Sequence, residues 1–169
     1  MPDRPMKQVA AVRGMRLPAR GLLSQLSEER RVSERGKTIL IVDDEAHIVH
    51  IIRYKLEREG FEVVTAGDGQ EGYELAQSVD PDLIVTDFQM PVLSGYEMCV
   101  KLHGADVTAD TPVVMVTARG HKLSPSELAA TNIRQMMCKP FSARELLSVI
   151  GELLIESSDG ESREGVNAA

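Results

Sequence analysis

The sequence is poor in several residue types and patterns that mark particular protein classes. It has no tryptophan and two cysteines, Cys99 and Cys138, which are too few and wrongly spaced to form a zinc site by themselves. Their apolar surroundings predict buried free thiols, as is usual in a reducing cytosol. No run approaches about 18 consecutive apolar residues, and the N-terminus lacks the apolar core of a secretory signal. We therefore expect a cytoplasmic protein without a membrane span.

The charge is unevenly distributed along the chain. Residues 1–37 hold nine Lys/Arg and four Asp/Glu, whereas residues 38–169 hold ten Lys/Arg and twenty-two Asp/Glu. The acidic body argues against nucleic-acid binding by the folded part, because neutralising phosphates requires clustered cations. The basic head has no aromatic residue to stack on bases, so we interpret residues 1–36 as a mostly disordered extension. Docking of this extension to nucleic acid, an anionic membrane or an acidic partner is the alternative.

Short apolar runs alternate with segments of helical periodicity between these ends. The runs, which we predict to be strands, cover residues 38–42, 62–66, 82–86, 112–116 and 134–138. Continuous apolar runs indicate burial on both faces, which a parallel sheet between two layers of helices provides. The alternation predicts an α/β fold, namely a doubly wound (βα)5 sandwich around a five-stranded parallel sheet.

The predicted helices complete this domain. They cover residues 45–59, 69–78 and 94–103, a short segment from Ser124 to near Asn132, and a last segment that begins after Ser142. Ser124 and Ser142 are each followed three residues later by a glutamate, which is the pattern of a capping box at a helix start. We predict one folded domain over residues 37–156 and a disordered polar tail over residues 157–169.

Four of the five runs are followed by residues that can take part in phosphate chemistry. Asp43 and Asp44 follow the first run, Asp87 the third, Thr117 the fourth and Lys139 the fifth. Since the carboxyl ends of parallel strands meet at one edge of the sheet, where such folds bind their ligands, we expect these side chains to share one pocket. The general polarity of loops accounts for one or two of them, but not for this combination at four strand ends.

Three carboxylates in one pocket repel one another unless a cation compensates them. Hard oxygen ligands suit Mg²⁺, so we predict a magnesium site with Asp44 and Asp87 as direct ligands and Asp43 acting through water. Lys139 supplies a second positive charge, and Thr117 supplies a hydroxyl donor. A carboxylate in this setting can serve only as a metal ligand, or it can attack phosphorus and become an acyl phosphate; the residues alone leave both uses open.

The motifs, taken in their order, closely resemble those of the receiver domain of two-component response regulators, over residues 37 to 155. They are Ile41-Val42-Asp43-Asp44-Glu45, Asp87-Phe88-Gln89-Met90-Pro91 with Ser94-Gly95, Val116-Thr117-Ala118 and Lys139-Pro140-Phe141. The acidic pair or the Lys-Pro-Phe motif alone would be a weak signal, whereas the whole set is highly specific. The resemblance implies a flavodoxin-like sheet with strand order 2-1-3-4-5.

The same resemblance implies a role for each residue of the predicted pocket. Asp87 is the phosphoryl acceptor, Lys139 pairs with the phosphoryl group, and Thr117 is the switch hydroxyl. The family also implies a cis peptide bond before Pro140. The Mg²⁺ ligands that it implies are Asp43, Asp44, Asp87 and the backbone carbonyl of Gln89.

In function, the resemblance implies a single-domain response regulator and not a conventional enzyme, since it catalyses only its own phosphorylation and dephosphorylation. A sensor histidine kinase or a histidine phosphotransfer protein donates the phosphoryl group of a phosphohistidine to Asp87. The acyl phosphate then alters the surface around the fourth helix, fifth strand and fifth helix, which a downstream protein effector reads.

The sequence departs from the family three residues before the lysine, where receivers generally carry Tyr, Phe or His. That position holds Met136, which fills similar space but lacks a ring with two positions and a phenol hydrogen bond. An alternative function is therefore a receiver-like interaction module whose switch is degenerate. A further alternative, which we rank lower, is an acyl-phosphate phosphohydrolase on a similar sheet, although the sequence shows no inserted cap.

Overall fold

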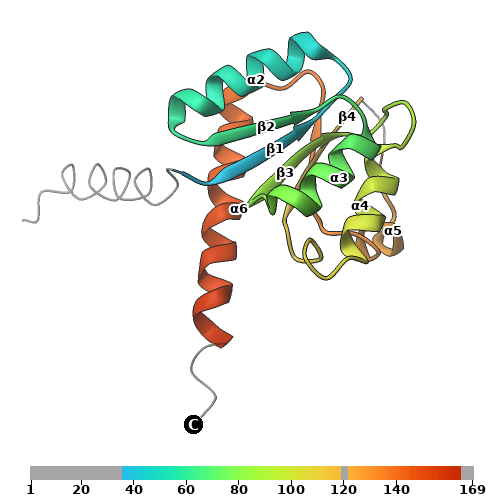
Figure 1. Ribbon diagram of the computed structural model, residues 1–169, viewed down its shortest axis with the longest axis vertical. Helices are drawn as coiled ribbons and strands as arrows, with labels where there is room; N and C mark the ends of the chain where they lie inside the picture. Colours follow the sequence, from blue (N-terminus) through green and yellow to red (C-terminus); the bar gives the residue numbers. More distant parts are fainter. Residues whose placement is uncertain (1–35, 119–121, 165–169) are drawn as a thin grey trace, which may run out of the picture. The chain divides into compact units, whose positions relative to one another are not determined.

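The computed structural model describes residues 36–118 and 122–164 (Figure 1), and for residues 158–164 it describes the backbone alone. The predicted basic extension lies outside the described residues apart from Gly36, and so do residues 165–169. Strands and helices alternate along the described chain. They are β1 (Thr38–Val42), α2 (Ala46–Glu59), β2 (Glu62–Ala66), α3 (Gly69–Val79), β3 (Leu83–Asp87), α4 (Gly95–His103), β4 (Val113–Thr117), α5 (Pro125–Ala129), β5 (Ile133–Cys138) and α6 (Ala143–Glu164).

The strands form one parallel sheet with the order β2-β1-β3-β4-β5, which confirms the predicted fold class. Each predicted strand boundary lies within one residue of the observed one. The register aligns Val42 with Thr86, Asp87 with Val116, and Thr117 with Cys138. The carboxyl ends of β1, β3, β4 and β5 therefore meet at one edge, as the sequence predicted.

Helices cover both faces of the sheet (Figure 1), and the alternation of side chains along β1 shows why. Ile39 and Ile41 pack in one core cluster with residues of α2 and α6. Leu40 and Val42, which point to the opposite face, pack in a second cluster with residues of α3 and α4. Burial on both faces is the reason that β1 and β3 read as unbroken apolar runs.

The two predicted capping boxes are present. Ser124 Oγ accepts a hydrogen bond from the Glu127 N–H at 3.3 Å, and the Glu127 carboxylate accepts one from the Ser124 N–H at 2.7 Å. Ser142 and Glu145 make the same reciprocal pair at the start of α6, at 3.1 and 2.7 Å. These local motifs were readable from the sequence because both partners lie within four residues of each other.

Two helix ends differ from the prediction. Helix α5 ends at Ala129 and not near Asn132, because Asn132 is buried and its side-chain amide donates to the carbonyl oxygens of Thr108 and Thr111 at 3.1 and 2.7 Å. Helix α6 continues to Glu164, which corrects the predicted start of a disordered tail at residue 157. Extending an existing helix adds one backbone hydrogen bond per residue without a new nucleation cost.

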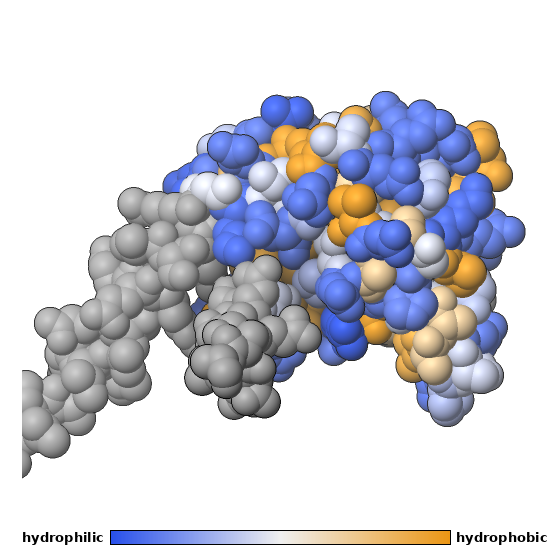
Figure 2. Space-filling model, turned by 60° about the horizontal axis from the view of Figure 1, so that its bottom comes forward, coloured by the Kyte–Doolittle hydropathy of each residue, from blue (hydrophilic) through white to orange (hydrophobic). Residues whose placement is uncertain are grey.

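The surface is mostly polar on the face shown in Figure 2, where hydrophobic side chains lie scattered among hydrophilic ones. Among the described residues, no helix is both long and apolar enough to cross a membrane.

Candidate functional site

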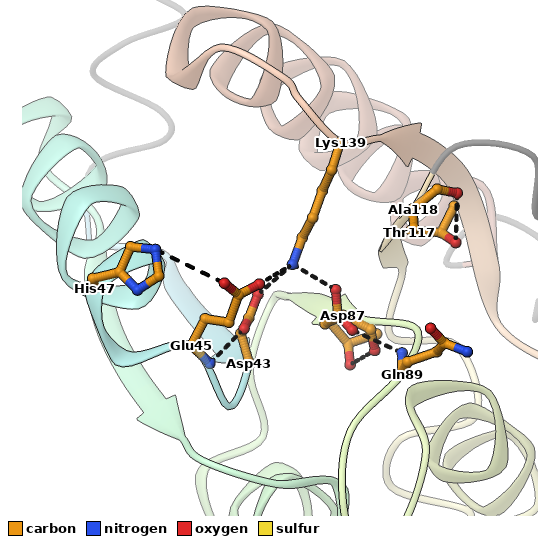
Figure 3. Close-up of polar contacts among 9 residues, drawn as sticks. Asp43, Glu45, His47, Asp87, Gln89, Thr117, Ala118 and Lys139 are labelled. Carbon is orange, nitrogen blue, oxygen red and sulfur yellow. Dashed lines mark hydrogen bonds and ion pairs between the residues drawn. The ribbon is translucent and has the colours of Figure 1, made fainter.

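Asp87 is the last residue of β3, a strand in which all five residues are buried. Its side chain is 10% exposed. The Gln89 N–H donates a hydrogen bond to Asp87 Oδ2 at 2.7 Å, and Lys139 Nζ lies 2.7 Å from Asp87 Oδ1 (Figure 3). Helix α4 begins at Gly95, directly beside Asp87. The approach is so close that a side chain at Gly95 would clash with the Asp87 carbonyl oxygen. Both carboxylate oxygens of Asp87 therefore have fixed partners.

Lys139 follows β5 and reaches back over the carboxyl edge of the sheet. Its backbone N–H donates to the Thr117 carbonyl at 2.8 Å, and the Lys139-Pro140 peptide bond is cis, as predicted. The ammonium contacts three carboxylates, at 2.7 Å for Asp87, 3.0 Å for Glu45 and 3.3 Å for Asp43 (Figure 3). Residues that lie 94 and 96 positions from Lys139 in the sequence thus meet at one charged group.

Burial and charge act in opposite directions on Lys139. Burial by itself lowers the pKa of the ammonium, but hydrogen bonds to Asp87 and Glu45 and the negative charges of Asp43 and Asp87 outweigh burial and raise that pKa. The lysine is therefore a permanent cation at neutral pH, placed where it can neutralise negative charge beside the Asp87 carboxylate.

Asp43 directly follows β1 and is 6% exposed. Burial raises the pKa of its carboxyl group, although the hydrogen bond from the Glu45 N–H, at 2.8 Å, and the charge of Lys139 oppose that rise. A buried carboxylate with a raised pKa beside a second carboxylate is stabilised by an additional cation.

Glu45 also belongs to the site, although the sequence pattern did not predict it as a site residue. It is the third acidic residue of the run after β1, and its carboxylate accepts a hydrogen bond from Lys139, which lowers its pKa. The acidic run was visible in the sequence, but nothing in the run indicates which of its three side chains turns toward a lysine from another strand.

Two predicted residues do not join this cluster through their side chains. Asp44 is exposed, and no hydrogen bond or ion pair among the described residues connects it to Asp43, Asp87 or Lys139. Thr117 is buried at the end of β4, but its hydroxyl donates to the Ala118 carbonyl at 3.3 Å and lies apart from Asp87 (Figure 3). The shared pocket is thus built from the first, third and fifth strands.

The carboxylate oxygens of the site are hard ligands, which suit a hard divalent cation. Within the part of the chain that the structure describes, no group of three or more His, Cys, Asp or Glu side chains is arranged to hold a metal ion. However, Asp43, Glu45 and Asp87 carry three negative charges against the single positive charge of Lys139. The uncompensated charge and the carboxylate oxygens fit Mg²⁺, which binds through one or two carboxylates and retains several waters.

The predicted burial of the two cysteines is confirmed for Cys99 only. Cys99 is buried, and burial raises the pKa of its thiol to about 12, so that it is a neutral core residue. Cys138 is exposed. The predicted burial of Cys138 is therefore wrong, because it ends the edge strand of the sheet, where one side has no neighbouring strand among the described residues.

Comparisons with known proteins agree with this geometry. The model of the family described as "Response regulator receiver domain" matches residues 39–151. The alkaline phosphatase synthesis transcriptional regulatory protein PhoP of Bacillus subtilis is 40% identical over 125 residues, which cover 72% of this chain and 50% of PhoP. The chain spans about half the length of the curated relatives it matches.

Solved structures show the same fold. The chemotaxis response regulator CheY4 of Vibrio cholerae is 30% identical, with a TM-score of 0.65 over 70% of this chain and 98% of CheY4. The receiver domain of the sensor histidine kinase PA1611 of Pseudomonas aeruginosa is 24% identical, with a TM-score of 0.64 over 70% of this chain and 98% of that domain. That structure holds a magnesium ion in its active site cleft.

Proposed function

Because this chain belongs to the response regulator receiver domain family, we propose that it receives a phosphoryl group on Asp87 from a phosphohistidine of a partner protein. The observation that carries the proposal is the contact between Asp87 and Lys139, 2.7 Å apart at the carboxyl edge of the sheet. The proposed donor is a sensor histidine kinase or a histidine phosphotransfer protein. As a receiver domain of two-component regulators, the chain acts as a phosphorylation switch and not as a conventional enzyme.

The proposed transfer is a substitution at phosphorus. An Asp87 carboxylate oxygen attacks the phosphorus atom, an O–P bond forms, and the N–P bond of the phosphohistidine breaks with its electron pair passing to the imidazole. Lys139 neutralises negative charge on the phosphoryl oxygens during the transfer. The Gln89 N–H, which donates to Asp87 Oδ2 at 2.7 Å, holds the carboxylate in one orientation.

We propose that Asp43, Asp44, Asp87 and the Gln89 backbone carbonyl hold Mg²⁺ for this reaction. When bound, the ion supplies further neutralisation of the phosphoryl oxygens. The excess negative charge of the site and the magnesium ion in the PA1611 receiver domain support this assignment.

The proposed readout passes through Thr117. The phosphoryl group brings about −1.5 to −2 charge and three acceptor oxygens, and the Thr117 hydroxyl can exchange its 3.3 Å bond to Ala118 for a bond to one of them. Movement of the loop after β4 then alters the surface around α5, β5 and α6. We propose that a downstream protein effector binds this surface.

Substituting the acceptor tests the proposal. We expect Asp87→Asn to take up no acid-labile phosphate from acetyl phosphate with Mg²⁺, measured by mass spectrometry of the intact protein. Asp106→Asn, which removes an exposed aspartate from the loop after α4, should be labelled like the wild type. Full labelling of Asp87→Asn would refute Asp87 as the acceptor.

A second candidate function is a receiver-like module that is phosphorylated but does not switch. Met136 favours it, because this half-buried methionine packs against the core where the family generally has an aromatic residue. Beryllofluoride with Mg²⁺, followed by amide NMR, separates the two functions. Shift changes that stop at the loops around Asp87 support the degenerate switch, whereas changes that reach Met136 and α6 support the working one.

A further inference from the structure

The Lys139 ammonium is shared among carboxylates that differ in burial. It has three hydrogens, and its three acidic neighbours are Asp87, Glu45 and Asp43, at 2.7, 3.0 and 3.3 Å. The side chains of Asp43 and Asp87 are 6% and 10% exposed, whereas that of Glu45 is 46% exposed. One cation is therefore divided between a buried pair and a carboxylate at the rim.

The backbone fixes Glu45 at this rim position. Glu45 lies between β1 and α2, and its N–H donates to Asp43 Oδ1 at 2.8 Å, which ties the two residues together. One oxygen of its carboxylate meets Lys139, and the other lies 3.8 Å from His47 Nε2. Because Glu45 is half exposed, water can solvate its charge, so this carboxylate can hold the lysine without a large burial cost.

A lysine and a divalent cation compete for the same buried oxygens. Each Lys139 hydrogen that is donated to Asp43 or Asp87 occupies an oxygen and cancels a charge that would attract Mg²⁺. Without Glu45, the ammonium would have only the buried pair as partners among the described residues. The cluster would also become less negative: Asp43, Glu45, Asp87 and Lys139 together carry a net charge of −2, and removing the charge of Glu45 leaves −1.

We propose that Glu45 is a positioning residue, which draws the Lys139 ammonium partly away from Asp43 and Asp87 and so keeps these two carboxylates available to Mg²⁺. The proposal rests on the proposed function, since the ion is the one assigned to that site. It gives the third acidic residue of the run a role that differs from metal ligation.

The test is a titration of Mg²⁺ alone into the full chain, without any phosphoryl donor, followed by amide NMR. We expect the Kd for Mg²⁺ to be about three- to tenfold higher in Glu45→Gln than in the wild type. The matched control is Glu62→Gln, which removes the same charge from an exposed position at the amino edge of the sheet and should leave the Kd unchanged. The effect of Glu45→Gln should shrink as ionic strength rises, because Glu45 is half exposed.

A double-mutant cycle with Lys139→Met distinguishes positioning from a simple charge effect. If Glu45 acts through the lysine, the effect of Glu45→Gln should fall below about twofold when Lys139 is absent. An equal effect with and without Lys139 overturns the positioning role, and so does an unchanged Kd in Glu45→Gln. A wild-type chain that binds no Mg²⁺ overturns the metal assignment of the proposed function itself, and this inference with it.

Discussion

Asp87, at the end of β3, and Lys139, directly after β5, form the shortest ion pair in the site, yet the two strands differ in their surroundings. β3 is central, pairs with β1 and β4, and has all five residues buried. β5 lies at the sheet edge, and Ile133 is its only buried residue. Asp87, the proposed acceptor, thus ends a fully buried central strand, whereas Met136 lies in, and Lys139 directly follows, an edge strand with several exposed residues.

The pairing of β5 adds to this difference. Its register with β4 shifts between Val113 and Val114, so that Val113 aligns with Ile133 and Val114 with Gln135. Such irregularities are typical of sheet edges, where they turn side chains outward. The proposed phosphorylation thus lies at the central strand, and the proposed readout lies at the edge strand.

The largest expected effect concerns packing. Ile84→Ala on β3 removes a fully buried side chain, and we expect it to lower the free energy of unfolding by about 3 kcal/mol. Met136→Ala on β5 removes a half-buried side chain, and we expect a loss of about 1 kcal/mol. Urea unfolding followed by circular dichroism measures both. Equal losses would contradict the contrast between the strands.

A smaller effect concerns the buried charge at the same edge. The pKa of Asp43 is raised above its ordinary value of 3.8 in the folded protein, so ionisation is less favourable there than in the unfolded chain. This carboxyl group therefore costs no stability below pH 3.8, and its cost grows as the pH rises through the folded pKa.

We accordingly expect Asp43→Asn to raise the free energy of unfolding at pH 7 and to have little effect near pH 3.8. Urea unfolding of both proteins across this pH range, without added metal, provides the measurement. If the stability gain of Asp43→Asn over the wild type increased as the pH fell, the argument that burial raises the pKa of Asp43 would be contradicted.

The smallest effect concerns the edge strand itself. We expect Met136→Phe to leave the rate of Asp87 phosphorylation by acetyl phosphate within about twofold of the wild type, because Met136 packs against the apolar core cluster that contains Leu40 and Met115. The ring should instead extend the amide shift changes induced by beryllofluoride along β5 and into α6. A large change in phosphorylation rate would show that chemistry and readout are not separable in this way.

Much of the fold was predictable because its signals are local. The apolar runs, the helix periodicity and the capping boxes at Ser124 and Ser142 involve residues a few positions apart. Helix ends were less predictable, as Asn132 shows. Its side-chain amide donates hydrogen bonds to the carbonyl oxygens of Thr108 and Thr111, which lie more than twenty residues away in the sequence. The exposure of Cys138 likewise follows from the place of β5 in the sheet and not from its apolar neighbours in the chain.

The sequence by itself determined that carboxylates, a hydroxyl and a lysine follow successive strands, because strand ends are set by local hydrophobicity. Only the tertiary structure decided which of them meet. Lys139 reaches Asp43, Glu45 and Asp87, while the Asp44 side chain is exposed and the Thr117 hydroxyl bonds to Ala118. The physical reason is that contacts between side chains depend on strand order, register and side-chain direction, which residues distant in sequence establish together.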